Sequence, residues 1–533
     1  MKRKTNNWVF AIILTLPVVL FFLGYLFNHS PDLIPTGFIQ YDNVAYIAYA
    51  RQYLDSNSFH IFYSNPFDIQ APSIYFQPQT VFFAFILFLG VPPGAILIPF
   101  TILCSLICFR LVIRIYDFLV VQNPFRKFHI LLFAWGGGLL AISGGIGSLF
   151  LYPGEPVLSH LFFLDPESGW WGLNFGRSLM FSCEAYYHAL FLGIIYSILI
   201  RRWSLALILI FLLSISHPFT GIEIIGIVCL WMVWEVVINR KNIPLFFAGF
   251  SILLLAFHLF YYLFYLEQFA HHRSVSSQYS LTWGLRYYRM LPAYALVGAL
   301  AIASIYLSTV RNFLASRTNR LFICWFLVAF LLANHDMFMK ARQPIHFTRG
   351  YIWTSLFLLG LPALNQLTQY LKSTWKGVAL ALFGCIFLLD NILWIGTHIF
   401  YTAKTAHANY ITKSQQTVLS QIHKASTDST LIISNDEIAG YLSTVYTSAY
   451  PFYSHPYTTP FAREKKYADS VFKSTGELHP HWMKGDILFV VKKTDSVSLR
   501  NWNIASLAAL IKISENGEYI IYRYPLPKMK MDE

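Results

Sequence analysis

The acidic residue with the clearest chemical potential in this sequence is Asp42. It follows the first long apolar run, residues 8–27, and it opens a helix-like stretch that reaches Leu54. A carboxylate at such a position could take the proton of an attacking hydroxyl group, as a general base does. Asp and Asn also favour the N-cap of a helix, so a purely structural cap is the competing interpretation.

A second acidic segment lies in residues 152–181, where Asp165 and Glu167 stand just before Trp170 and Trp171. The two indole rings would suit stacking on a sugar, and tryptophan is also common in the aromatic belt at a membrane interface. Both interpretations of the tryptophan pair stay open.

Further polar side chains lie inside or beside apolar runs, where each needs a partner or a function. Glu184 and His188 are four residues apart, which places them on one face of a helix. A metal or a hydrogen-bonded pair fits that spacing, but a metal site needs more ligands, so a polar cluster facing a cavity is favoured. The identity of any cofactor stays unknown, with a divalent cation as one option.

His217 precedes Pro218, which predicts a helix break at the outer surface, and Glu223 lies about one turn inside the next apolar run. A carboxylate at that depth must face a cavity or a partner. Contact with a substrate and a structural pairing with Arg177 are equally compatible with the sequence.

Basic residues also occur in segments that we expect on the outer face. One segment contains His271 and His272, and the other contains Lys340, Arg342 and Arg349. Cations at the bilayer edge suit a lipid phosphate or diphosphate, because the arginine fork matches phosphate oxygens. Ordinary contact with anionic lipid is the alternative.

The composition requires a membrane to hold these residues. Hydrophobic residues make up 56% of the 533 positions and charged residues 12%, whereas soluble domains carry about 25% charged residues. The runs 8–27, 242–266 and 377–397 exceed the length of about 18 residues that separates a span from a core helix, and Glu267 and Asp390 lie near run ends. The net charge of +13 comes from scattered short loops, which excludes nucleic acid as a partner.

The basic clusters predict the topology. Lysine and arginine accumulate on the cytoplasmic side, and six clusters separate the twelve apolar runs. All six clusters face the cytoplasm if the short run 81–91 forms a membrane-surface or re-entrant helix on the outer side and the other eleven runs cross. This arrangement predicts an integral protein of a bacterial inner membrane with a cytoplasmic N-terminus. The outer loops 28–94 and 152–181 and residues 401–533 are then extracytoplasmic.

Residues 401–533 differ in character from the rest of the chain and predict a soluble α/β domain. Helices are expected over 415–425, 436–445 and 461–473. Strands are expected over 430–434, 486–491, 508–513 and 519–524, with a turn at Glu515-Asn516-Gly517. No glycine-rich phosphate loop is present in this segment.

The layout resembles the GT-C superfamily of membrane glycosyltransferases. The resemblance rests on a long outer loop with an early acid, Asp42, on a proline-led surface helix from Pro72 to Gly90, on the acids Asp165 and Glu167, and on the α/β tail. It implies a GT-C-like membrane domain over residues 1–400. Family members often carry paired acids in the first loop, whereas Tyr41-Asp42-Asn43 supplies one, which leaves metal dependence open.

The resemblance also implies an activity, namely hexosyl or pentosyl transfer from a polyprenyl-phosphate-linked donor to a glycan, lipid or protein acceptor. Asp42 would be the base, Asp165 or Glu167 the second acid, and the outer arginines would hold the donor phosphate. A transporter or flippase is the main alternative, but repeated halves and matched broken helices are not apparent in the sequence. A non-catalytic envelope scaffold is the third, and it predicts that Asp42 tolerates replacement.

Overall fold

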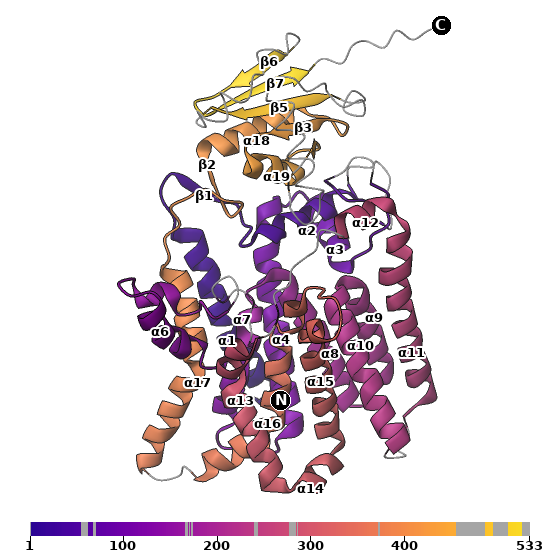
Figure 1. The fold of residues 1–533 in the computed structure, drawn as a ribbon, viewed down its shortest axis with the longest axis vertical. Helices are drawn as coiled ribbons and strands as arrows, with labels where there is room; N and C mark the ends of the chain where they lie inside the picture. Colours follow the sequence, from indigo (N-terminus) through magenta and orange to yellow (C-terminus); the bar gives the residue numbers. More distant parts are fainter. Residues whose placement is uncertain are drawn as a thin grey trace. The chain divides into compact units, whose positions relative to one another are not determined.

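The computed structural model describes residues 2–54, 62–67, 71–165, 169, 171, 174–238, 243–276, 284, 286–370, 374–452, 454, 486–493 and 510–524 (Figure 1). The chain forms two compact units. The membrane unit contains residues 1–25, 98–264 and 280–401, and the α/β unit contains residues 26–97, 265–279 and 402–533. The first outer loop and the C-terminal tail therefore belong to the same compact unit.

Among the described residues, six helices are long and apolar enough to cross a membrane. They are α1 (Lys2–Phe27), α4 (Leu97–Leu119), α10 (Pro218–Val233), α11 (Leu245–Leu259), α13 (Tyr287–Ser308) and α17 (Thr374–Phe400). A bent pair, α5 (Arg126–Trp135) and α6 (Leu140–Leu151), would make a seventh span. The prediction of eleven spans requires four further helices to cross, namely α8 (Ser182–Leu199), α9 (Trp203–Ser216), α15 (Arg317–Ala333) and α16 (Tyr351–Tyr370).

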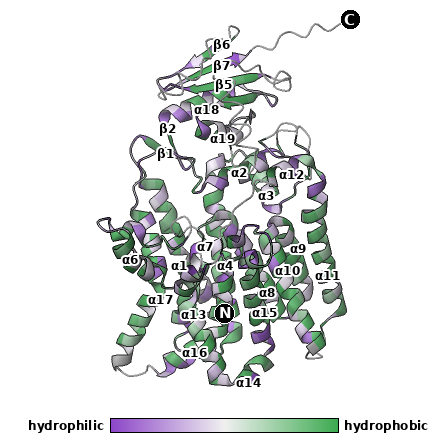
Figure 2. Ribbon diagram, in the orientation of Figure 1, coloured by the Kyte–Doolittle hydropathy of each residue, from purple (hydrophilic) through white to green (hydrophobic). Residues whose placement is uncertain are grey.

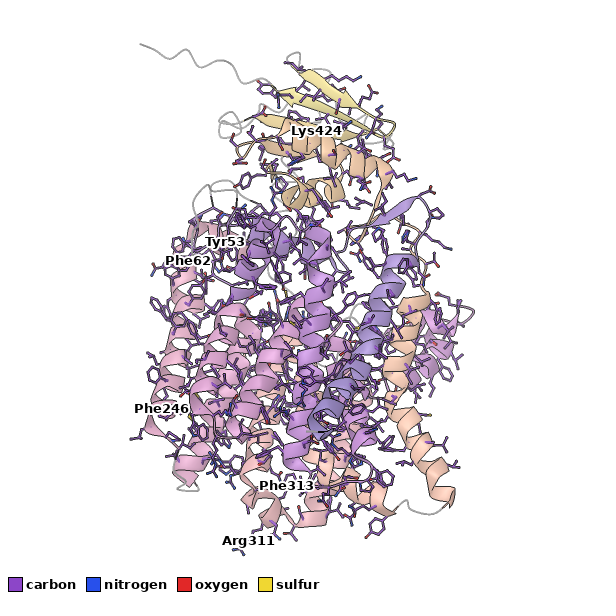
Figure 3. All side chains as sticks on the ribbon, turned by 180° about the vertical axis from the view of Figure 1, so that it is seen from behind. Tyr53, Phe62, Phe246, Arg311, Phe313 and Lys424 are labelled. Carbon is purple, nitrogen blue, oxygen red and sulfur yellow. The ribbon has the colours of Figure 1, made fainter. Side chains whose placement is uncertain are left out.

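The helices of the membrane unit pack through neighbouring pairs. Helix α9 contacts α8, α10 and α11, and α15 and α13 both contact α16. Apolar residues, drawn in green, are frequent along the helices of the membrane unit (Figure 2), and large ones such as Phe246 in α11 lie on the exterior (Figure 3). A bundle that exposes so much apolar surface matches a lipid environment, because soluble monomers rarely expose large apolar patches.

The 128–151 run, which the sequence predicts as one span, is broken at three consecutive glycines. Helix α5 ends at Trp135, and α6 starts at Leu140 after a bend of 48°. The buried Asp390 of α17 accepts hydrogen bonds from the backbone N–H groups of Gly138, Leu140 and Ala141 at 2.9–3.1 Å. A Cβ at Gly137 would lie 2.6 Å from the Cβ of Asp390, so only glycine fits at position 137 beside this part of α17.

Other helices satisfy the remaining backbone groups of this break. The N–H of Gly137 donates to the carbonyl of Phe387 at 2.7 Å, and the Trp353 indole donates to the carbonyl of Gly137 at 3.1 Å. The Asn391 side-chain amide donates to the carbonyl of Trp135 at 2.9 Å. Non-helical backbone at membrane depth is tolerated only where protein buries and satisfies it, and α16 and α17 do so here.

Basic residues lie near the starts of several helices of the membrane unit, and two of them form ion pairs with residues of other helices. Arg126, at the start of α5, pairs with Asp117 at 2.6 Å and donates to Asn7 of α1 at 2.9 Å. Arg320, near the start of α15, pairs with the buried Glu235 at 2.5 Å. Helix α14 (Val310–Ala315) carries the exposed Arg311 at one end of the bundle (Figure 3).

The α/β unit contains a five-stranded sheet of order β4-β3-β5-β7-β6. Its strands are β3 (Leu431–Ser434), β4 (Tyr450–Pro451), β5 (Ile487–Lys492), β6 (Ile511–Glu515) and β7 (Tyr519–Tyr524). Strand β3 pairs in parallel with β4 and β5, and β7 runs antiparallel to β5 and β6. Helices α18 (Lys413–Ala425) and α19 (Glu437–Tyr446) bury Val418 and Ala439 in a core with β5 and β7.

These elements confirm the α/β character predicted for the tail. The expected helices 415–425 and 436–445 correspond to α18 and α19, and the expected strands correspond to β3, β5, β6 and β7. The helix expected over 461–473 lies outside the described residues. The first outer loop adds α2 (Tyr41–Arg51), α3 (Pro78–Phe88) and β1 (Leu33–Pro35), which pairs with β2 (Tyr410–Thr412) of the tail.

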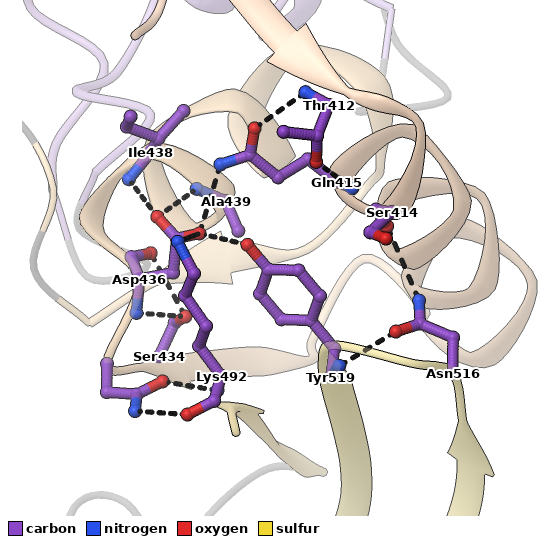
Figure 4. A network of polar contacts seen from close by, with 11 residues as sticks. Thr412, Ser414, Gln415, Ser434, Asp436, Ile438, Ala439, Lys492, Asn516 and Tyr519 are labelled. Atoms are coloured by element: carbon purple, nitrogen blue, oxygen red, sulfur yellow. Dashed lines mark hydrogen bonds and ion pairs between the residues drawn. The ribbon is translucent and has the colours of Figure 1, made fainter. Parts of the chain in front are cut away.

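A buried carboxylate organises the edge of the sheet at the carboxyl ends of β3 and β5 (Figure 4). Asp436 caps α19 by accepting the backbone N–H groups of Ile438 at 3.0 Å and Ala439 at 3.3 Å. Its other oxygen accepts hydrogen bonds from the Gln415 amide at 3.1 Å and the Tyr519 hydroxyl. Ligands of α/β sheets commonly bind at such a switch in strand order, but here the chain's own side chains occupy the position.

We expect Asp436→Ala to destabilise the α/β unit by about 2–4 kcal/mol, because it removes a helix cap and leaves two buried donors unsatisfied. Hydrogen exchange of the full-length protein should show faster exchange in β5 and β7. The control is Lys424→Ala at the exposed end of α18 (Figure 3), which should leave exchange unchanged. Equal protection in both variants would show that the network adds little stability.

Candidate substrate site

Three helices of the membrane unit begin close to one another, and their first turns carry buried polar residues. These are α8, α10 and α16, which contribute Glu184, Thr220 and Tyr351. A short 3-10 helix, η8 (Pro344–Phe347), contacts α10 and α15 beside them. Helix α8 ends next to the basic pair at 201–202, about 25 Å from Glu184 at 1.5 Å per residue.

An ion pair links two of the predicted site residues across 165 positions of sequence. The Arg349 guanidinium donates a hydrogen bond to Glu184, whose side chain is almost fully buried. His188 donates a hydrogen bond from Nδ1 to the Glu184 backbone carbonyl at 2.9 Å, and the same nitrogen lies 3.9 Å from the second carboxylate oxygen of Glu184. Among the described residues, no group of three His, Cys, Asp or Glu side chains is placed to hold a metal ion.

Aromatic rings surround the arginine. The Arg349 guanidinium lies 4.7 Å from the centre of the Trp171 ring, within the range of a cation–π interaction. His346 meets Trp171 edge-on at 4.9 Å and stacks on Phe219 at 4.6 Å. A cation flanked by an indole is suited to a phosphorylated sugar, because the two groups can bind its charged and apolar parts separately.

His217 forms the second half of the cluster. It caps α10 by accepting the N–H of Thr220 at 3.2 Å, and its ring stacks on Tyr187 at 4.5 Å. The Tyr351 hydroxyl donates to Thr220 at 3.5 Å, and the Tyr351 ring stacks on His188 at 4.5 Å. The sequence interpretation did not include Tyr351 or Thr220, although Tyr351 follows Arg349 by two positions and Thr220 follows His217 by three.

Glu223 is the least satisfied polar residue of this cluster. It is 0% exposed, and neither carboxylate oxygen has a hydrogen-bond partner among the described residues. It lies within electrostatic range of Glu184 and Tyr351. A buried group of this kind requires an explanation such as a cavity, a water or a ligand, so the substrate interpretation gains support over the pairing with Arg177.

Arg177 pairs with a different acid. Its guanidinium lies 3.6 Å from Asp165, both side chains are fully buried, and the rings of Phe162 and Trp394 flank it at 5.3 and 5.8 Å. Gly169 has a φ of +92°, and a Cβ there would lie 2.8 Å from Trp394, so only glycine fits beside the pair. Glu167 and Trp170, which were also predicted to contribute, lie outside the described residues.

Asp42 lies in the α/β unit and is exposed in the first turn of α2. The N-cap of α2 is Gln40, with extended backbone, so Asp42 is not the cap that the competing interpretation requires. Tyr41 packs against Tyr441 of α19 with ring centres 4.5 Å apart. Burial, and then the carboxylates of Glu437 and Asp42, raise the pKa of Tyr41 above its ordinary range, so its hydroxyl stays protonated beside the proposed base.

The predicted histidine pair also belongs to the α/β unit, in α12 (Ala270–Ser276). His271 is 3.2 Å from the amide of Asn65, and His272 is 3.0 Å from the hydroxyl of Tyr75. Both histidines therefore hold residues of the first outer loop. Substrate binding by this pair stays a prediction.

Two of the predicted cations, Lys340 and Arg342, are exposed in the loop that follows α15. The described residues contain no acidic partner for either side chain. The loop is anchored instead by its backbone, since the N–H of Arg342 donates to the His335 ring at 2.8 Å. Unpaired cations that precede Arg349 by a few residues are available to a phosphate.

The imidazoles of the cluster stay neutral at physiological pH. Burial, followed by the charge of Arg349, lowers the pKa of His217 and of His346 well below the ordinary value of 6.5. The unfolded chain binds protons at these positions below pH 6.5, whereas the folded chain does not. Stability should therefore fall as the pH drops below 6.5, with a slope of up to about 1.4 kcal/mol per pH unit for each histidine.

We expect His346→Gln to reduce the loss of folding stability at acidic pH, because the glutamine side chain carries no charge at any of these pH values. The measurement is the difference in melting temperature between pH 5.5 and pH 7.5 for the purified protein in detergent. His423→Gln, at an exposed histidine of α18, should keep the wild-type difference. A wild-type protein that melts at the same temperature at both pH values would contradict the assignment.

With this geometry established, the chain can be compared with known proteins. No protein-family model matches the sequence, and no curated protein sequence matches it. Among solved structures, the chain is similar to the arabinofuranosyltransferase AftD from mycobacteria, determined by cryo-electron microscopy, with a TM-score of 0.50 and 14% sequence identity. The chain shares the fold of this arabinofuranosyltransferase.

The shared fold extends over 99% of this chain and 40% of AftD, so the chain spans about two fifths of the length of that protein. This confirms the predicted resemblance at the level of the fold. At 14% identity the similarity shows the fold alone.

Proposed function

We propose that this protein is a membrane glycosyltransferase that uses a polyprenyl-phosphate-linked sugar and acts on an acceptor at the extracytoplasmic face. The observation that supports the proposal best is the buried polar cluster around Glu184 and Arg349. Within a membrane unit, Glu223, His188 and His346 keep polar atoms without hydrogen-bond partners among the described residues. Polar groups at membrane depth are costly and are generally functional.

The donor fits the cluster by its chemistry. Its prenyl chain stays in lipid, which leaves a phosphate and a sugar at the interface. Arg349 offers a planar cation for phosphate oxygens, with Lys340 and Arg342 earlier in the same loop. Trp171 offers a ring for the sugar.

The transfer step that we assign is a displacement at the anomeric carbon. The acceptor hydroxyl oxygen bonds to that carbon, the bond from carbon to the phosphate oxygen breaks, and polyprenyl phosphate leaves. Asp42 takes the proton of the acceptor hydroxyl. The cationic side chains stabilise the charge that grows on the departing phosphate, which is where electrostatic catalysis acts. Asp165 pairs with Arg177. We therefore assign it a structural role in the site and no role in the proton transfer.

The orientation follows from the distribution of charge along α8. The cluster lies at the first turn of this helix, and Arg201 and Arg202 follow its last turn. Since basic loops favour the cytoplasm, we place the cluster at the extracytoplasmic boundary.

We expect Asp42→Asn to lower the rate of sugar transfer by about 10²–10⁴-fold, because asparagine cannot accept the proton. Transfer is followed with membrane lipid extracts as the donor source and the purified protein in vesicles. Asp32→Asn, at an exposed acid of the same outer loop, is the matched control and should keep full activity. Transfer by Asp42→Asn at the wild-type rate would remove Asp42 from the mechanism and favour a scaffold.

A further inference from the structure

An apolar groove lies between α1 and α5, away from the polar cluster. It has a volume of about 400 Å³ and is lined by Phe10, Ile13 and Pro17 of α1 and by Leu131 and Trp135 of α5. The share of liquid volume of one water molecule is about 30 Å³, and cavities with apolar walls do not hold water well. Because both helices belong to apolar runs of the membrane unit, the groove opens toward lipid.

A hydrogen bond joins the two helices beside the groove. The Trp135 indole of α5 donates to the carbonyl of Leu14 in α1 at 2.9 Å. Pro17, which also lines the groove, has no backbone N–H to donate to the carbonyl of Ile13 within α1.

One end of the groove carries a cation. Lys127 lines the groove, is exposed, and has no acidic partner among the described residues. The neighbouring Arg126 already binds Asp117 and Asn7, so it is neutralised and Lys127 is not. Trp135 marks the other end, about 12 Å along α5 at 1.5 Å per residue.

We propose that this groove binds one acyl chain of an anionic phospholipid, with the lipid phosphate on Lys127. The apolar wall selects a hydrocarbon chain, and the single unpaired cation selects a negative headgroup. The lysine lies beside the basic N-terminal turn of α5, which the charge rule assigns to the cytoplasmic leaflet. The occupant is therefore a structural lipid of that leaflet and not the donor at the outer boundary.

Native mass spectrometry of the detergent-purified protein tests the proposal, with phosphatidylglycerol and phosphatidylcholine as the two probes. The wild-type protein should retain one phosphatidylglycerol in preference to phosphatidylcholine. Lys127→Glu should weaken phosphatidylglycerol binding by roughly 30-fold, because a basic residue near the headgroup contributes about 1 kcal/mol and reversing its charge replaces that attraction by a repulsion of similar size. Ile13→Trp, at an exposed position of the wall, should abolish binding of both lipids by filling the groove.

Arg311→Glu is the matched control, because Arg311 is exposed on α14 and does not line the groove (Figure 3). It should retain phosphatidylglycerol like the wild type. Equal retention by all variants, or equal loss in Arg311→Glu, would overturn the proposal. Displacement of phosphatidylglycerol by equimolar polyprenyl phosphate would overturn the choice of occupant.

Discussion

Arg349→Ala is expected to lower sugar transfer by about 100-fold or more and to destabilise the membrane unit by about 3–5 kcal/mol. The first effect follows from loss of a preorganised cation at the departing phosphate. The second follows because Glu184 is buried, and removing one partner of a buried ion pair leaves an uncompensated charge. Transfer from lipid donors and the melting temperature in detergent are the two measurements.

A double variant separates the two effects. Glu184→Gln together with Arg349→Met removes both charges, so stability should recover most of its loss while transfer stays low. Arg349→Lys keeps the charge but loses the planar fork and the stacking on Trp171, and intermediate transfer is expected. An Arg349→Ala protein that transfers sugar within threefold of the wild-type rate would show that the pair is only structural.

Asp390→Ala is expected to cost about 4 kcal/mol or more, which is among the largest effects of a single substitution. Three backbone N–H groups at the start of α6 lose their acceptor, and each hydrogen bond to a charged group contributes about 1.5–3 kcal/mol. The break between α5 and α6 should then lose its fixed geometry. The readout is the melting temperature together with the yield of folded protein in detergent.

Two further variants define this effect. Asp390→Asn keeps one acceptor oxygen and should fall between the alanine variant and the wild type. Ile392→Ala, at an exposed position of the same helix, should change the melting temperature little. If Asp390→Ala melts within 2 °C of the wild type, the carboxylate does not hold the break.

The elements of the tail and the six long apolar helices could be predicted because local patterns determine them. Strand β7 has the predicted bounds, and α18 and α19 lie within two residues of theirs, since alternation, caps and turn residues are local signals. The break at Gly136–Gly138 was missed because the run 128–151 is apolar on both sides of it. The three consecutive glycines were the available signal, and Asp390 was noted only as a charge near a run end.

The sequence allowed most residues of the polar cluster to be named, but it did not show which of them contact one another. Glu184, His188, His217 and Glu223 were predicted because polar groups are costly in lipid, and Arg349 because an outer cation suits a lipid phosphate. The structure gathers these residues near the starts of α8, α10 and α16. Their pairing was not predictable, since Glu184 and Arg349 are 165 positions apart and depend on how the helices pack. For the same reason the sequence did not reveal that Arg177 pairs with Asp165.

The identity of the donor tests the central claim most directly. Purified protein in vesicles is given radiolabelled polyprenyl-phosphate-linked sugars from bacterial membranes or, separately, the corresponding nucleotide sugars, with a membrane glycan fraction as acceptor. We predict transfer of label from the lipid-linked donor, none from the nucleotide sugar, and loss of transfer in Arg349→Ala. Transfer from the nucleotide sugar alone, or lipid-dependent transfer that Arg349→Ala leaves intact, would contradict the account.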